Sequence, residues 1–215
     1  MELRNITFDG HKFYQMEDMI VGHWIDVDNT YLLNDEWEIF AITHLINNIK
    51  FDWNCADIGA NWGAYSCIMS HRTLGMVHSF EPHPDNFNLL SKNTDHCRNV
   101  KKYNFALGLK KESLNLMLSK GSGGHSLKIK RSDNSILVNV LSLDSLNLAL
   151  DCIKLDVEGA GYDILLGAQE TLKKVKYISM EVHAGTDEKK AYQFLQDLGF
   201  TIQSYNKYNF IATRF

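Results

Sequence analysis

The chain has 215 residues and a formal net charge of −4, with 45% hydrophobic and 22% charged residues. These values are typical of one globular domain, and they exclude a disordered or fibrous chain. An acidic chain is poorly suited to a phosphate backbone, so we expect no nucleic-acid partner. No apolar run reaches the length of a membrane span, and the N-terminus lacks the apolar core of a signal peptide. We therefore expect no membrane partner and a soluble, cytoplasmic protein.

Residues 1–50 are predicted to cover the sheet of a single domain rather than to form a second one. Alternating residues at 24–27 favour a strand, and Asn34 is a suitable N-cap for a helix that ends at Asn47-Asn48. Residues from about 50 to 215 are predicted to form the catalytic core.

A strand, a glycine turn and a helix begin this core. Residues 51–56 are predicted to form a buried strand, followed by Asp57, Gly59 and Gly63 and by a helix from Ala64. Glycines allow a backbone to approach a ligand closely, so this unit is typical of nucleotide-binding α/β folds. Many such turns nevertheless contain glycines and bind nothing.

Strands and helices then alternate, which favours right-handed crossovers and a mainly parallel sheet. Further strands are predicted at 76–80, 100–107, 151–155 and 175–180, and a C-terminal hairpin at 200–205 and 209–215. A helix is predicted to run from Pro84 to about Cys97, and another to follow Gly159. Strands at 114–118 and 136–140 flank a glycine-rich loop, 121–126. This loop is either a flexible connector or a lid that brings His125 over a substrate.

Four predicted strands end in an acidic residue. Ligands of open parallel sheets bind beyond the carboxyl ends of the strands, so these residues are expected at one edge. Each could be a helix cap, but four gathered carboxylates repel one another unless a cationic or hydroxyl-rich ligand shares the site. The four residues are Asp57, Glu81, Asp156 and Glu181.

The glycine spacing favours S-adenosylmethionine over a dinucleotide. Pyrophosphate binding uses G-x-G-x-x-G, whereas the glycines here are Gly59 and Gly63. S-adenosylmethionine has no phosphate. We expect Asp57 near its α-amino group, the amides of residues 59–63 at its carboxylate, and Glu81 at the two ribose hydroxyls.

The sequence resembles the FkbM-type family of S-adenosylmethionine-dependent methyltransferases. The matching segments are DIGANWGAYS, SFEPHPDNFNLL, NFALG, LSLDSL, IKLDVEGAGYDILLGA and ISMEVH, in family order over about residues 50–185. The resemblance implies a Rossmann-like class I α/β fold: a seven-stranded, mostly parallel sheet with helices on both faces and a C-terminal antiparallel hairpin. It also implies methylation of an oxygen on a small-molecule, carbohydrate or polyketide-like acceptor. The implied cofactor contacts are Asp57, Gly59, Asn61, Gly63 and Glu81, with Asn104 to Ala106 beside the adenine.

Gly161 departs from the family, which usually has an acidic residue after DVEGA. If that acidic residue contacts substrate, the glycine changes the substrate class or the activity. If it is only a helix residue, little changes.

Methylation of a hydroxyl needs a nearby base that removes the acceptor proton. The candidates lie just after the fourth and fifth predicted strands. The candidate catalytic residues are Asp156, Glu158 and His183, of which Asp156 is expected to position a ligand rather than take a proton. Glu158 could instead cap a helix, and His183 could be an ordinary surface residue. Magnesium held by Asp156, Glu181 and His183 is conceivable, but the spacing does not favour it, and no metal site is predicted.

Four cysteines, at 55, 67, 97 and 152, contain no C-x-x-C pair and are expected to be buried thiols. Two other functions stay open: a nicotinamide-dependent reductase, and a module that binds S-adenosylmethionine without catalysis. The sequence gives no oligomeric state.

Overall fold

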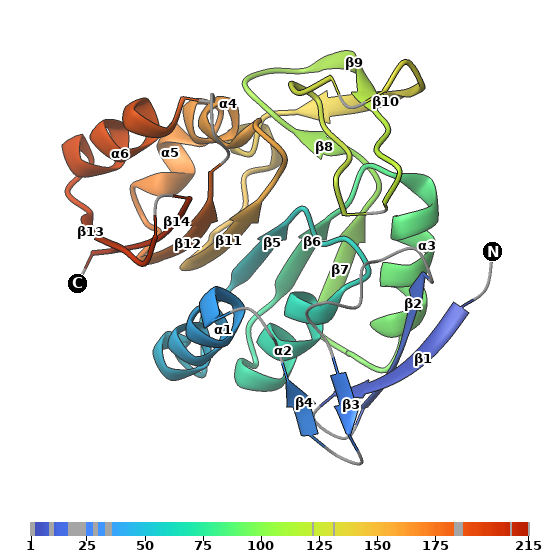
Figure 1. Ribbon diagram of the computed structural model, residues 1–215. Coiled ribbons are helices and arrows are strands. Elements are labelled where there is room, and N and C mark those ends of the chain that lie inside the picture. The colour runs from blue at the N-terminus through green and yellow to red at the C-terminus, as the bar shows by residue number, and fades with distance from the viewer. Residues whose placement is uncertain are drawn as a thin grey trace.

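A seven-stranded sheet forms the centre of the protein (Figure 1). The computed structural model describes residues 3–8, 11–16, 25–27, 30–32, 36–121, 123–130, 132–182, 187–206 and 208–214, with side chains from residue 40 onward except Glu188. The strand order is β13-β14-β12-β11-β5-β6-β7, and only β14 runs antiparallel to its neighbours in the sheet. This arrangement confirms the predicted class I α/β fold with its C-terminal hairpin. The strands are β5 (Cys55–Ile58), β6 (Val77–Phe80), β7 (Val100–Tyr103), β11 (Cys152–Asp156), β12 (Tyr177–Glu181), β13 (Thr201–Ser204) and β14 (Asn209–Thr213).

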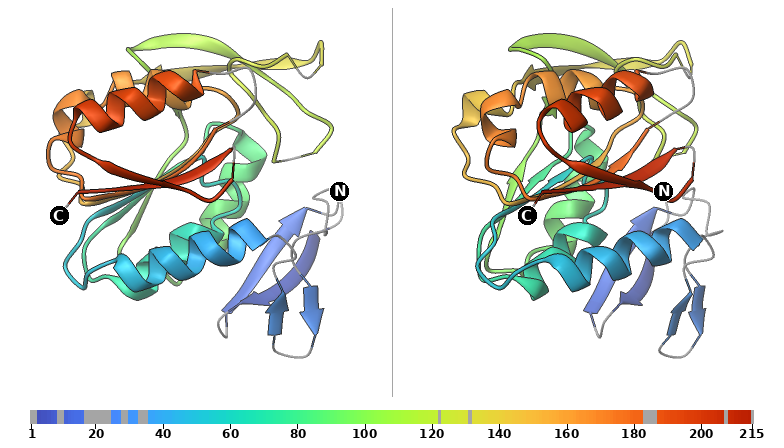
Figure 2. Two further views of the ribbon diagram at one scale, coloured as in Figure 1. Left: turned by 60° about the vertical axis from the view of Figure 1, so that its left-hand side comes forward. Right: turned by 90° about the vertical axis from the view of Figure 1, so that its left-hand side faces the viewer.

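Helices cover both faces of this sheet (Figure 2). Their apolar residues pack against the strands in two layers. One layer contains Leu45 and Met69 from the first helices, and the other contains Ile164 and Leu195. Burial on both faces explains why the parallel strands are almost continuously apolar. On one face lie α1 (Glu36–Asn48), α2 (Ala64–Arg72) and α3 (Pro84–Asn93), and on the other α4 (Gly161–Leu166), α5 (Gln169–Leu172) and α6 (Glu188–Asp197).

A second, three-stranded sheet lies beyond the carboxyl ends of the main strands (Figure 1). It contains β8 (Ala106–Leu107), β9 (Glu112–Met117) and β10 (Ser135–Leu141). The prediction of one strand over 100–107 is therefore wrong. The chain leaves the main sheet at Asn104, whose side-chain amide donates to the carbonyl oxygens of Glu81 (2.9 Å) and Pro82 (3.2 Å).

Other predicted boundaries also need correction. The first core strand starts at Cys55, not at Phe51, because residues 51–54 form a turn in which Trp53 N donates to Lys50 O and Phe51 is 69% exposed. The helix that begins at Pro84 ends at Asn93, four residues before the predicted end. The helix after residue 159 is interrupted between α4 and α5.

The N-terminal residues form two small hairpins, β1 (Leu3–Phe8) with β2 (His11–Met16), and β3 (Ile25–Val27) with β4 (Thr30–Leu32). Strand β3 and the end of α1 at Asn48 confirm two predictions, whereas the Asn34 cap lies outside the described residues. Strand β2 contacts α3 (Figure 1). The single-domain assignment stays a prediction. In the described part of the chain, no helix has the length and apolarity needed to cross a membrane.

Candidate active site

Strand register places the acidic residues of the sheet at two different levels. Strand side chains alternate between faces, so residues two apart share one face. Asp57 pairs with Ser79 and Lys154 in the neighbouring strands, which makes one row across the α1–α2 face. Asp156 and Glu181 are paired two residues further along their strands, at the rim of the sheet. The strand β5 position at that rim is occupied by Gly59.

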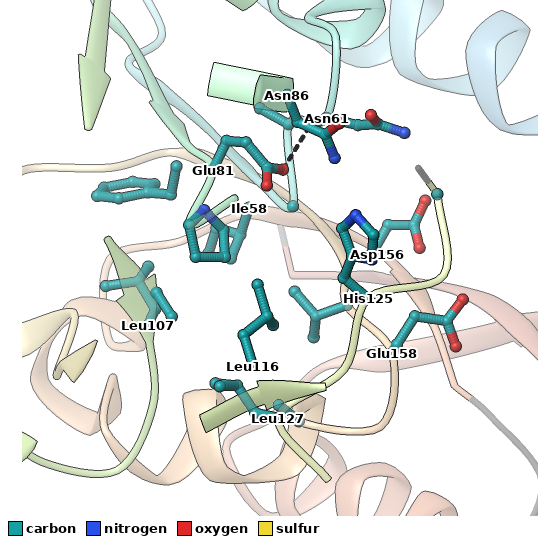
Figure 3. Close-up of a pocket in the computed structure, with 18 of the residues that line it drawn as sticks. Ile58, Asn61, Glu81, Asn86, Leu107, Leu116, His125, Leu127, Asp156 and Glu158 are labelled. Carbon is teal, nitrogen blue, oxygen red and sulfur yellow. Dashed lines mark hydrogen bonds between the residues drawn. The ribbon is translucent and has the colours of Figure 1, made fainter. Parts of the chain in front are cut away.

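A cavity of about 670 Å³ opens at this rim. Polar side chains lie on two of its sides in Figure 3, with Glu81 and Asn61 on one side and Asp156 and Glu158 on the other. Apolar side chains fill the space between them. These apolar residues include Ile58, Leu107, Leu116 and Leu127, and Phe105, Ala106 and Ile164 complete that part of the lining.

Glu81 is held in place by backbone amides. Its Oε2 accepts from Asn61 N at 2.9 Å (Figure 3), and its Oε1 accepts from His83 N at 2.8 Å. Burial raises the pKa of Glu81 to about 7, although these hydrogen bonds favour the charged form. The carboxylate is therefore fixed in orientation, and it lines the cavity.

Gly59 is required because the backbone of the glycine loop passes very close to the end of strand β11. Gly59 has φ +82°, and a Cβ there would lie 1.9 Å from the carbonyl oxygen of Asp156. Gly59 lines the cavity, whereas Gly63, with φ +96° at the start of α2, does not. Asn61 also has positive φ and lines the cavity. Its Oδ1 is buried and has no donor among the described residues.

The amides of this loop are largely used within the protein. Gly59 N and Ala60 N both donate to Phe80 O, Gly63 N donates to Ala60 O, and Asn61 N donates to Glu81. The expectation that the amides of residues 59–63 bind the cofactor carboxylate is therefore wrong for these four amides, which already have acceptors. The loop is held in shape by these bonds, and it exposes its side chains to the cavity.

Asp57 and Asn104 also lie outside the lining. Asp57 is fully buried, and its Oδ2 accepts from Ser66 Oγ at 2.6 Å. Burial raises the pKa of Asp57, and the charge of Lys154 opposes that shift. Because Asp57 sits one level below the rim, any effect on a ligand is indirect. Asn104 braces the loop after β6 instead, while its neighbour Ala106 does line the cavity.

Lys154 is a site residue that sequence reasoning missed. Its Nζ lies 3.0 Å from Asp156 Oδ2 and 4.3 Å from the centre of the Tyr65 ring. Among the described residues that line the cavity, four are acidic and Lys154 is the one lysine or arginine. The sequence did contain a signal for it. Lys154 is a lysine inside the apolar strand CIKLD, and it lies two residues before Asp156, which places both side chains on the same face of the sheet.

The glycine-rich segment, residues 118–121 and 123–130, closes one side of the cavity. Ser119, Gly121, Gly124 and His125 belong to the lining. Ser126 is buried, and its Oγ donates to the carbonyl oxygen of Glu158 at 2.6 Å. This favours the lid over the loose connector. The His125 ring lies 4.3 Å from that of His83, and its Nδ1 accepts from Ser119 N.

The catalytic candidates are only partly brought together. Asp156 and Glu158 line the cavity, but His183 lies outside the described residues. Gly161 is buried at the start of α4, where a Cβ would lie 2.5 Å from Met180 Cε. That Cβ points into the core, which favours the structural explanation of this departure.

Solved structures share this fold. The Precorrin-6y C5,15-methyltransferase of Geobacter metallireducens GS-15 matches with a TM-score of 0.53 and 13% identity over 89% of this chain and 95% of that one. SMU.1697c of Streptococcus mutans, solved in complex with SAH, matches with a TM-score of 0.53 and 11% identity over 83% and 96% of the two chains. At these identities the likeness concerns the fold alone.

Sequence comparison adds a family. The hexuronic acid methyltransferase AglP of Haloferax volcanii is 29% identical over 147 residues, which are 66% of this chain and 60% of that protein. The chain thus spans well under the full length of this relative. The family profile of the methyltransferase FkbM domain matches residues 57–202. This chain belongs to the FkbM family of methyltransferases.

Proposed function

We propose that this protein transfers the methyl group of S-adenosylmethionine to a hydroxyl of a carbohydrate or related small-molecule acceptor. The observation that carries the proposal is the fixed carboxylate of Glu81 at the end of β6, facing a cavity whose opposite side presents Asp156 and Glu158. Such a carboxylate can accept from both hydroxyls of a ribose. FkbM family membership supports methyl transfer rather than hydride transfer.

The residues of the cavity fit this cofactor. Glu81 would hold the ribose, and the apolar wall with Phe105 and Ala106 would receive the adenine. Asn61 Oδ1, buried without a described donor, would accept from the α-amino group. Lys154 would face the carboxylate, since the loop amides already have acceptors. When bound, the sulfonium supplies an activated methyl group, and the protein has to align the acceptor and take its proton.

Asp156 is suited to positioning, because its carboxylate is paired with Lys154. Glu158 and His183 are the candidates for the base. His125 has a different role. Its Nδ1 accepts from a backbone amide, so the neutral ring carries its proton on Nε2 and can donate a hydrogen bond, but not accept one, at that nitrogen.

The relative from Haloferax volcanii supports a carbohydrate acceptor, since its name specifies a hexuronic acid. A cavity side with several polar groups also fits a polyhydroxylated molecule. The proposal also includes a glycan or small-molecule partner and a cytoplasmic location.

Two measurements test it. Calorimetry should detect binding of S-adenosylmethionine and of its demethylated product, but no binding of NADH. Binding of NADH alone would indicate the reductase. Release of demethylated cofactor should then depend on an acceptor from a panel of uronic acids, matched neutral sugars and hydroxylated non-sugars. Cofactor binding without turnover on any of them would favour the non-catalytic module.

A further inference from the structure

Two buried cysteines meet between α2 and α3, away from the cavity lining. Cys67 Sγ and Cys97 Sγ are 3.6 Å apart. Cys67 lies in α2, and Cys97 follows α3 in the loop to β7. His96, adjacent to Cys97 and exposed, brings a third ligand atom, and the three ligand atoms all lie within 4.8 Å of one another.

The spacing suits a tetrahedral soft-metal site. With zinc–sulfur bonds of about 2.3 Å, tetrahedral geometry separates two sulfurs by about 3.8 Å, close to the distance found here. His71 lies one helical turn after Cys67, so both project from one face of α2. Its ring centre is 6.1 Å from that of His96.

We propose that Cys67, Cys97 and His96 bind one Zn²⁺, with His71 as the fourth ligand. Two sulfurs and two imidazoles are a ligand set that zinc favours. The buried thiols supply the inner side of the site, and the exposed histidines give the ion a route from solvent.

The ion would join α2 to the loop that follows α3. Cys67 and Cys97 belong to one apolar cluster with Trp62 and Leu89. Asn93 joins the same contact, since its Nδ2 donates to Trp62 O and its carbonyl oxygen accepts from Cys67. Sequence spacing could not reveal this site, because 29 residues separate the cysteines and no C-x-x-C pair exists.

The molecule contains a matched control. Cys55 and Cys152 face each other across β5 and β11, and both are fully buried. Among the described side chains, no third metal ligand joins this pair at comparable reach. Cys152→Ala should therefore leave metal binding intact, whereas Cys97→Ser and Cys67→Ser should remove it.

The experiment uses the full chain, reduced and freed of metal, and titrated with Zn²⁺ and Co²⁺ alone. One equivalent of Co²⁺ should give thiolate charge-transfer absorption and the intense d–d bands of a tetrahedral site, and Zn²⁺ should displace it. Zn²⁺ should also raise the melting temperature of the wild type and of Cys152→Ala, but not of Cys97→Ser. His96→Ala should weaken binding while keeping the charge-transfer band.

Three results would overturn the proposal. They are substoichiometric binding without the charge-transfer band, unchanged binding in Cys97→Ser, and a Cys67–Cys97 disulfide in protein isolated without reductant that persists when Zn²⁺ is present. Co²⁺ is read by its absorption, and Zn²⁺ by displacement of Co²⁺ and by the melting temperature, so these outcomes do not depend on methyl transfer. Circular dichroism of each variant separates loss of the ligand from loss of the fold.

Discussion

The two sides of the cavity are held by different means. On the Glu81 side, backbone amides fix the carboxylate, and the glycine loop bonds to the end of β6. On the Glu158 side, the hydroxyl of Ser126 in the glycine-rich segment donates to the carbonyl oxygen of Glu158 in the β11–α4 loop. Backbone contacts within a sheet resist motion, whereas a contact made by a side chain can break and form again as a loop opens and closes. We infer that the first side is built for a constant cofactor and the second for an acceptor that enters and leaves.

The strongest test of this division is removal of the base. Glu158→Gln or His183→Ala should lower turnover by roughly 10²- to 10⁴-fold, the usual contribution of a general base, with little change in cofactor affinity. The measurement is single-turnover methyl transfer beside calorimetry. Wild-type turnover in both variants would remove these residues from catalysis.

Glu81→Ala tests the fixed side. Two hydrogen bonds to a charged acceptor are worth about 3 kcal/mol or more, so cofactor affinity should fall on the order of 100-fold. Calorimetry measures the loss, and an unchanged circular dichroism spectrum shows that the sheet persists. Affinity equal to wild type would place the ribose elsewhere.

The raised pKa of Glu81, about 7, predicts a pH dependence of cofactor binding. The ionised form accepts from the ribose, and the proton is bound below this pKa. Affinity should therefore be highest above pH 7 and fall by up to tenfold per unit as pH decreases below it. Glu81→Gln should flatten this profile. A wild-type affinity that stays constant from pH 8 to 6 would contradict the assignment.

The smallest effect is expected on the Glu158 side. Ser126→Ala removes the tie to Glu158 O and the acceptor for the amides of Lys128 and Ile129. The KM for the acceptor should rise a few-fold while cofactor affinity is kept. Ser132→Ala is the control, since its hydroxyl donates to the carbonyl oxygens of Leu118 and Asn134 rather than to the β11–α4 loop. Equal effects of both changes would mean general loosening.

Local sequence signals predicted the Glu81 side of the cavity better than the Glu158 side. Glycine spacing and a strand-terminal acid identified Gly59 and Glu81, because both act next to their own strand. The level of Asp57 depends on register with β6 and β11, which a single strand does not reveal. Strands β9 and β10 of the second sheet were predicted, at 114–118 and 136–140. Strand β8 was missed because the break at Asn104 results from side-chain bonds to a distant loop. Phe51 was misplaced because an apolar run alone does not distinguish a strand from a turn.

Asn104 also connects the two halves of the molecule. Within three residues the chain passes from β7, beside the Glu81 loop, to β8, which pairs with the strand that supports the glycine-rich segment. A shift of the upper sheet would thus pull on the carbonyl of Glu81 itself. Loading one ligand would then alter the affinity for the other.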